Sequence, residues 1–197
     1  MNTATCAQGT TEWQQARCGV VTASNFKLVM TKGGGKTRKA YMMRLRNEIK
    51  TGEPTESYWS DAMLRGAELE PHARRAYEAK TGYAVREVGI NFLDESRRVG
   101  ASPDGLIDAD GGLEIKCPLV STHNKYLQSR RIPSQYMPQI QGNLWVSRRK
   151  WWDFVSFAPE RPPEEQIIIY RAYRDEGYIT RLEAEIRRFI EELDSLL

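Results

Sequence analysis

The feature that most constrains the fold is a short turn between two strand-like runs. Residues 105–107 and 113–117 are largely apolar, and they flank the sequence Ala-Asp-Gly-Gly at 109–112. Glycine and aspartate adopt the backbone conformations that a tight reversal needs, so this pattern is typical of a β-hairpin. We therefore predict a hairpin over residues 105–117 as part of a central β-sheet.

Helical and strand-like periodicity alternate along the rest of the chain. Apolar residues spaced three or four apart predict a short helix after Thr22 and longer helices over 38–50, 60–80, 135–147 and 179–197. Extended runs predict strands over 83–85, 90–93, 151–157 and 167–173. Because a proline removes a backbone donor, we expect the 60–80 helix to kink or restart at Pro71. The predicted fold class is α/β (α+β-like), with a mixed central β-sheet flanked by helices.

Composition places the chain among compact soluble domains. It has 197 residues, of which 40% are hydrophobic, so one domain over residues 1–197 can bury a sizeable core. The three cysteines are odd in number and far apart, which indicates a reducing cytoplasm rather than a disulfide framework or a zinc site. We expect neither a signal peptide nor a membrane span, because no basic stretch precedes an apolar one and no apolar run approaches ~20 residues.

The charge balance leaves nucleic acid open as a partner. Lys and Arg total 29 against 26 Asp and Glu, a formal net charge of +3. This near-balance excludes a strongly basic tail, but a mildly positive total is compatible with a basic groove beside an acidic pocket.

The predicted hairpin brings chemically active side chains together. Asp104 precedes the first strand, and Glu114 and Lys116 lie two residues apart on the second, so they share one face. Two carboxylates that leave coordination positions open are a common way to hold Mg²⁺. A lysine beside the ion can polarise or deprotonate a water, or stabilise the charge on a phosphorane. The pattern thus indicates phosphodiester hydrolysis, the alternative being an ordinary solvated strand face.

This segment resembles the PD-(D/E)XK nuclease core, with Pro103-Asp104 as the PD pair and Glu114-Ile115-Lys116 as the ExK triplet. The similarity extends to the phage lambda exonuclease family of viral recombination nucleases, through five segments in family order. These segments are Trp13-x3-Arg17-x-Gly19 with 20–24, Gly66-x3-Glu70, 101–106, 112–118 and 136–145. The resemblance covers nearly the whole chain from Trp13 onwards.

The resemblance implies further site residues. Glu70 would add an acidic group to the metal site, and the backbone carbonyl of Ile115 would be a further metal ligand. A pocket for the terminal 5′-phosphate would be formed by Arg17, Ser24, Ser102 and Gln139. Physical chemistry agrees, because helix N-termini and arginine forks both bind phosphate. Without the family pattern, these positions would be interpreted as surface or helix-start residues.

Other residues are candidate DNA contacts. Lys36 and Arg38 belong to a basic, glycine-rich loop over 31–39, and the resemblance implies that Met63 corresponds to an apolar residue that wedges between base pairs in the family. Gln141 is a further candidate, although residues two apart do not share a helix face well, so Gln139 is the one expected to reach the site. Three tryptophans, at 145, 151 and 152, are expected in the core rather than stacked on bases.

The function that the resemblance implies is a Mg²⁺-dependent 5′→3′ double-stranded DNA exonuclease. It would release 5′-mononucleotides, leave a 3′ overhang for recombination, and use two ions, with Mn²⁺ as a substitute. A ring-shaped homotrimer, a single-strand annealing protein and a phage or prophage origin in the bacterial cytoplasm are also implied. The alternatives are a PD-(D/E)XK endonuclease or resolvase, and a non-catalytic DNA-binding recombination scaffold.

Overall fold

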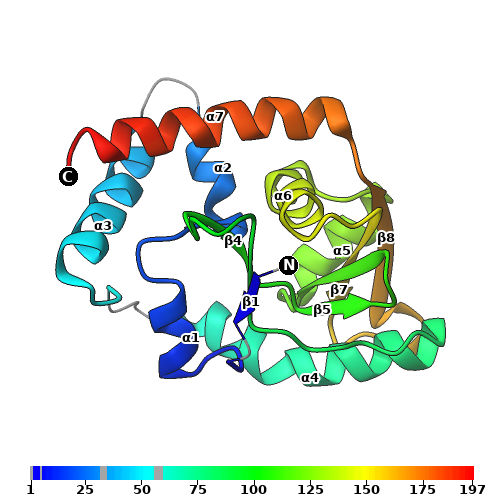
Figure 1. The fold of residues 1–197 in the computed structure, drawn as a ribbon. Coiled ribbons are helices and arrows are strands. Elements are labelled where there is room, and N and C mark those ends of the chain that lie inside the picture. The colour runs from blue at the N-terminus through cyan, green and yellow to red at the C-terminus, as the bar shows by residue number, and fades with distance from the viewer. Residues whose placement is uncertain (1, 5, 32–34, 56–59) are drawn as a thin grey trace.

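The computed structural model describes residues 2–4, 6–31, 35–55 and 60–197, which form a mixed α/β fold (Figure 1). Its described strands divide between two four-stranded mixed sheets. The predicted fold class is confirmed, with two sheets sharing the role of the expected central one. The helices are α1 (Thr11–Ala16), α2 (Phe26–Val29), α3 (Lys36–Thr51), α4 (Asp61–Thr81), α5 (Val120–Ser129), α6 (Met137–Ser147) and α7 (Glu176–Asp194), with short 3-10 turns η1 (Ala23–Asn25), η2 (Ser134–Tyr136) and η3 (Pro163–Glu165).

The smaller sheet pairs strands from the start of the chain with strands from residues 90–101. Its strand order is β1-β3-β4-β2, with β2 parallel to β4 and the other pairs antiparallel. The strands are β1 (Asn2–Ala4), β2 (Val21–Thr22), β3 (Ile90–Phe92) and β4 (Val99–Ala101). This sheet brings the segment after α1 next to the segment that leads into the predicted hairpin.

The larger sheet contains the predicted hairpin. Its order is β5-β6-β7-β8, with β6 parallel to β7 and the other pairs antiparallel. The strands are β5 (Gly105–Ile107), β6 (Gly111–Lys116), β7 (Trp151–Phe157) and β8 (Ile167–Tyr173). Helix α4 covers one face of this sheet, and α5 and α6 cover the other (Figure 1). Both faces of β6 are therefore buried.

The two glycines at the start of β6 are required by their neighbours. In the register of β6 with β7, Gly111 lies opposite Trp151 and Gly112 opposite Trp152. A Cβ atom on Gly112 would lie 2.2 Å from the Trp152 ring, and Trp152 is fully buried. The tryptophan rings thus occupy the space that side chains at 111 and 112 would need.

Helix α7 closes the fold on the side opposite α4. Its apolar face buries Ile179, Leu182, Ile186, Phe189 and Leu193, as the sequence pattern predicted. The helix packs against α2, α3 and α6 (Figure 1). No helix within the described residues is long and apolar enough to cross a membrane.

Several details differ from the sequence predictions, and the short elements α1, β1, β2 and β4 were not predicted. Residues 83–85 are not a strand, and only an isolated bridge between Arg86 and Leu106 follows them. Helix α4 continues through Pro71 as one element, because packing of Ala73 and Tyr77 on the sheet holds the second half in line with the first. Helix α5 was not predicted, because its polar and β-branched residues are weak helix formers. Tertiary contacts hold it instead, including the hydrogen bond of buried His123 with Ser156.

Replacing Gly112 by alanine should destabilise the protein by about 1–3 kcal/mol, because the new methyl group has no room beside Trp152. Thermal and urea unfolding measure this effect. Gly66→Ala is the matched control: Gly66 is helical with open space around its Cβ position, so alanine there should be neutral or stabilising. Equal unfolding midpoints for Gly112→Ala and the wild type would contradict this packing argument.

Candidate active site

A buried carboxylate lies at the centre of the site. Glu114 of β6 is only 1% exposed, and its Oε1 atom is 2.5 Å from Lys116 Nζ on the same strand face. Two side chains of α6 complete its surroundings: Gln139 Nε2 donates to Oε1 at 2.6 Å, and Asn143 Nδ2 donates to Oε2 at 3.1 Å. The predicted shared face of Glu114 and Lys116 is confirmed, but α6 covers it.

Asp104 is tied to the same strand from the other side of the hairpin. It lies directly before β5, and its Oδ2 atom accepts the backbone N–H of Ile115 at 2.6 Å. This hydrogen bond places the Asp104 carboxylate beside the backbone between Glu114 and Lys116. The convergence of two carboxylates and one lysine on the hairpin, predicted from spacing alone, is thus present in the structure.

Glu70 comes from the opposite layer. It lies on α4 and pairs with Arg74 one turn later, at 2.6 Å between Glu70 Oε1 and Arg74 Nη2. The same nitrogen donates to the backbone carbonyl of Asp104 at 3.2 Å. Helix α4 therefore brings Glu70 to the acidic centre together with an arginine that the sequence analysis did not select.

The electrostatics of the centre reflect the crowding of negative charge. Burial, Glu114 and Glu70 together raise the pKa of Asp104 well above its usual range. Burial also raises the pKa of Glu70, against the opposing effect of Arg74. Burial by itself would lower the pKa of Lys116, but the carboxylates of Glu114 and Asp104 outweigh this and raise it. A protonated lysine thus stands among carboxylates that repel one another.

The donor set suits a hard cation. Carboxylate and carbonyl oxygens are the ligands that Mg²⁺ takes, and a bound cation would relieve the mutual repulsion of Asp104, Glu70 and Glu114. Within the part of the chain that the structure describes, no group of three or more His, Cys, Asp or Glu side chains already has the arrangement of a metal centre. It is the chemistry of the donors, carboxylate and carbonyl oxygens, that fits the ion.

A second polar cluster lies next to Asp104. Arg17 ends α1, and its Nη1 atom donates to Ser102 Oγ at 3.0 Å. Trp13 donates to the same hydroxyl through Nε1 at 3.1 Å, and its ring lies 4.1 Å beneath the Arg17 guanidinium. Burial lowers the pKa of Arg17 to about 10, so the group stays charged at neutral pH. The cation–π contact supports the side chain that is predicted to meet phosphate.

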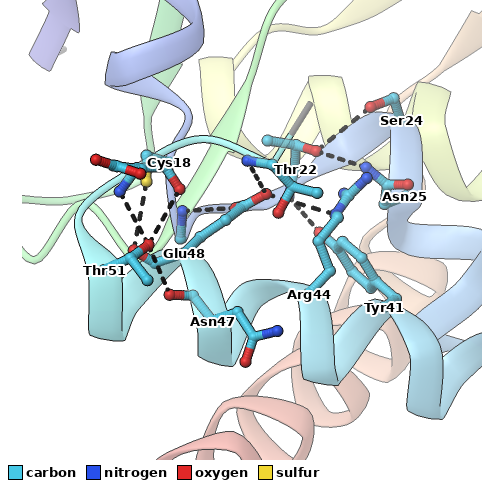
Figure 2. Close-up of polar contacts among 12 residues, drawn as sticks. Cys18, Thr22, Ser24, Asn25, Tyr41, Arg44, Asn47, Glu48 and Thr51 are labelled. Carbon is cyan, nitrogen blue, oxygen red and sulfur yellow. Dashed lines mark hydrogen bonds and ion pairs between the residues drawn. The ribbon is translucent and has the colours of Figure 1, made fainter. Parts of the chain in front are cut away.

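Helix α3 holds the segment that follows Arg17 (Figure 2). The buried Glu48 accepts the N–H of Gly19 at 2.9 Å through Oε2, and Tyr41 Oη accepts the N–H of Thr22 at 3.2 Å. Gly19 has φ +70°, and a Cβ atom there would lie 2.7 Å from Ile49 Cγ1. Its lack of a side chain lets the chain turn sharply against α3 and enter β2.

The four predicted phosphate-pocket residues do not all meet in this structure. Arg17 and Ser102 are in contact, whereas Gln139 donates to Glu114 and the exposed Ser24 lies 3.3 Å from the Thr22 hydroxyl. The short helix predicted after Thr22 is present as the 3-10 turn η1 followed directly by α2, and Thr22 lies at its N-cap without a capping hydrogen bond from its side chain.

Two predicted DNA contacts are wrong. Gln141 is buried, donates to the carbonyl of Tyr173 and accepts the N–H of Asp175, so it joins α6 to the start of α7. Arg38 is buried in a bidentate pair with Glu192 of α7, which leaves no free fork for phosphate. In both cases the polar side chain satisfies a tertiary contact that the local sequence does not reveal.

The other candidate contacts are compatible with the structure. Lys36 and Met63 are both exposed, Met63 at 47%, and they stay predictions. Lys32 of the basic loop lies outside the described residues. Trp145 and Trp152 are buried as expected, while Trp151 is half-buried beneath the Arg171 guanidinium at 3.6 Å.

Three site residues were missed by the sequence analysis: Trp13, Arg74 and Asn143. For all three the signal was helical spacing. Trp13 precedes Arg17 by four residues, and Arg74 follows Glu70 by four, so each pair shares a helix face. Asn143 follows Gln139 by the same interval on α6.

Fold and site together define the class of the protein. An aspartate before one hairpin strand and a Glu-x-Lys on the next, packed between helices in a mixed sheet, form the core of the PD-(D/E)XK nucleases. Residues 12–150 match the YqaJ-like viral recombinase domain, and the chain belongs to this family.

Solved structures agree with this placement. An alkaline exonuclease from Laribacter hongkongensis, LHK-Exo, is 39% identical and superposes with a TM-score of 0.88, covering 94% of this chain and 93% of LHK-Exo. The structure of LHK-Exo in complex with dAMP gives 40% identity and a TM-score of 0.89 over the same shares. A phage-related exonuclease from Haemophilus somnus 129PT shares the fold at 15% identity, with a TM-score of 0.72 over 90% of this chain and 94% of that one.

A shorter relative is known from Escherichia coli (strain K12). Its protein ExoD is 33% identical over 66 residues, which are 34% of this chain and 75% of ExoD. The similarity to LHK-Exo, in contrast, extends over nearly the full length of both chains.

Asp104→Asn should stabilise the protein in the presence of EDTA, and the gain should increase with pH. The pKa of Asp104 is higher in the folded than in the unfolded chain, so its contribution to stability is present at low pH and is lost as the pH rises through the folded value. Asparagine removes this loss and can still accept the N–H of Ile115. Urea unfolding from pH 4 to pH 9 measures the difference.

The matched control is Asp110→Asn in the turn of the same hairpin, where the carboxylate forms only an exposed pair with Lys150. Its effect should stay within about 1 kcal/mol. A gain for Asp104→Asn that shrinks as the pH rises would contradict the assigned electrostatics.

Proposed function

We propose that this protein is a Mg²⁺-dependent 5′→3′ exonuclease of double-stranded DNA. It releases 5′-mononucleotides and leaves a 3′ overhang for phage-type recombination by single-strand annealing. The observation that carries this proposal is the meeting of Asp104, Glu114 and Lys116 across one hairpin, in a chain that resembles an alkaline exonuclease over nearly its whole length. The complex of LHK-Exo with dAMP supports mononucleotide release, because dAMP is a 5′-mononucleotide.

The residues that would hold two Mg²⁺ ions are the carboxylates of Asp104, Glu114 and Glu70 and the carbonyl of Ile115. The bound ions supply Lewis acidity for the phosphodiester and lower the pKa of the attacking water. Gln139 and Asn143 orient Glu114 by donating one hydrogen bond to each of its oxygens. Mn²⁺ is expected to substitute, since it accepts the same oxygen ligands.

Lys116 acts as a proton-bearing group in this proposal. Its raised pKa favours the protonated form at neutral pH, so it is suited to orient the water and to stabilise charge on the phosphorane. Deprotonating the water, the other role that the sequence left open, would require a lysine with a lowered pKa.

The end of the digested strand would dock beside this centre. Arg17 and Ser102, which are already in contact, form one part of a 5′-phosphate pocket. Ser102 precedes Asp104 by two residues in the chain. Ser24 and Gln139 would complete it when the strand enters. Because the pocket and the acidic centre adjoin through 102–104, a docked 5′-phosphate would set the first phosphodiester over the carboxylates.

The further proposals concern assembly and place of action. We propose a ring-shaped homotrimer around the DNA, a single-strand annealing protein as partner, and the bacterial cytoplasm as the site of action for a phage or prophage protein. Lys36 and Met63, both exposed, would face the duplex. These statements rest on the resemblance to the lambda exonuclease family.

Lys116→Ala and Asp104→Ala should each lower Mg²⁺-dependent nucleotide release by about 100-fold or more, because each removes a group that acts in the transition state. Release of acid-soluble nucleotide from linear duplex is the measurement. Lys150→Ala is the control, since that lysine is exposed and pairs only with Asp110. Unchanged release by either variant would remove the catalytic assignment.

The proposed polarity is tested with linear duplex labelled at the 5′ or the 3′ end, with and without Mg²⁺. Early release of the 5′ label and a persistent 3′ strand are expected. Covalently closed circular duplex should stay intact, because an exonuclease needs an end. Cleavage of the circle would favour the endonuclease alternative, and DNA binding without any cleavage would favour the scaffold.

Arg17→Ala should slow digestion of 5′-phosphorylated ends by about 10- to 100-fold more than that of 5′-hydroxyl ends, the range expected when a charge-assisted hydrogen bond is lost. Initial rates on the two substrates give the ratio. Arg187→Ala, at an exposed position of α7, is the matched control. An equal slowing on both substrates would argue against the phosphate pocket.

A further inference from the structure

Arg74 lies where three segments of the acidic centre meet. Its Nη2 atom is 2.6 Å from Glu70 Oε1 and donates to the carbonyl of Asp104 at 3.2 Å. Its Nη1 atom is 2.8 Å from Glu87 Oε1, in the segment between α4 and β3. The Arg74 side chain is only 12% exposed, whereas Glu87 is 71% exposed. The buried part of this network is therefore the contact of Arg74 with Glu70 and Asp104, at the acidic centre, and the exposed part is its pair with Glu87.

We propose that Arg74 is a positioning residue that sets the affinity of the acidic centre for divalent cations. It holds the Glu70 carboxylate and the backbone of Asp104 in one fixed arrangement. The inference rests on the proposed function, and the role that it assigns to Arg74 acts through Glu70 and Asp104.

The first argument is electrostatic. The long side chain of Glu70 is held by a charged partner, because Arg74 Nη2 lies 2.6 Å from Glu70 Oε1. A positive charge at this distance restricts the carboxylate to one position. Arg74 supplies that charge from one helical turn away, in the Glu-before-basic order that favours an i,i+4 pair. Its burial weakens the screening that makes exposed pairs ineffective.

The second argument is geometric. The side chain of Asp104 is bound to the N–H of Ile115, and its carbonyl is bound to Arg74, so both ends of this residue are held. Through one guanidinium, α4 fixes the separation between two carboxylates that come from different layers of the fold. Lysine carries one nitrogen and cannot reach Glu70, Asp104 and Glu87 in the same way.

The test is Mn²⁺ titration of the purified protein without DNA, followed by electron paramagnetic resonance or calorimetry. Arg74→Gln should raise the Mn²⁺ dissociation constant by roughly 10- to 100-fold, as is typical when a group that orients metal ligands is removed. Arg74→Lys keeps the charge and the fold but should recover only part of the affinity. Arg75→Gln is the matched control, because Arg75 is the exposed neighbour on α4 and contacts only His72.

A second comparison separates positioning from general stability. Glu87→Gln removes the outer ion pair alone, so a role in tethering the 83–89 segment would show as a loss of thermal stability in both Glu87→Gln and Arg74→Gln. If Arg74 acts through Glu70, Arg74→Gln should cost much less Mn²⁺ affinity in a Glu70→Gln background than in the wild type. Equal costs in the two backgrounds would overturn the inference.

The two proposals fail in different ways. A wild-type protein that binds Mn²⁺ and digests DNA, together with Arg74 variants of unchanged Mn²⁺ affinity, would overturn the role of Arg74 and leave the proposed function standing. A wild-type protein that neither binds Mn²⁺ nor digests DNA would overturn both.

Discussion

The hydrogen bond from the N–H of Ile115 to the Asp104 carboxylate is the contact on which the site depends. It closes the hairpin at the point where β5 begins, and it fixes the spacing between Asp104 and the Glu114–Lys116 face. The rest of the fold supports this strand on both sides. Helix α4 covers the apolar face of β6, and α6 covers the polar face with amide groups that satisfy Glu114. A buried carboxylate is tolerated here because Lys116, Gln139 and Asn143 all donate hydrogen bonds to it.

Buried charge explains why helices carry so much of the site. The acidic centre places Asp104, Glu114 and Glu70 within reach of one another, at a cost in repulsion that raises the pKa of two of them. Lys116 and Arg74 offset that cost from the strand and from α4. Such an arrangement favours the binding of a cation, because an added positive charge relieves the repulsion between the carboxylates. The repulsion between these carboxylates thus lowers the stability of the fold at the place where the proposed chemistry needs them close together.

The cluster that is proposed to bind the 5′-phosphate depends on a different support. Arg17 stacks on Trp13 and shares the Ser102 hydroxyl with it, while buried Glu48 of α3 holds the following turn at Gly19. The parallel pairing of β2 with β4 then brings this N-terminal segment beside residues 101–104, some eighty positions later in the chain. The Arg17–Ser102 cluster and the acidic centre, which come from different parts of the sequence, therefore adjoin at the start of β5.

The sequence alone determined the hairpin, the shared face of Glu114 and Lys116 and the amphipathic α7, because these follow from local periodicity and turn chemistry. Tertiary structure decided the rest. Arg38 and Gln141 became internal partners of Glu192 and of the β8–α7 connection, and α5 formed despite weak local propensity. Arg74 reaches the Asp104 carbonyl only because α4 packs against β6 and β7. Contacts between residues far apart in the chain leave no periodic signal, so burial and pairing at these positions appear only in the folded protein.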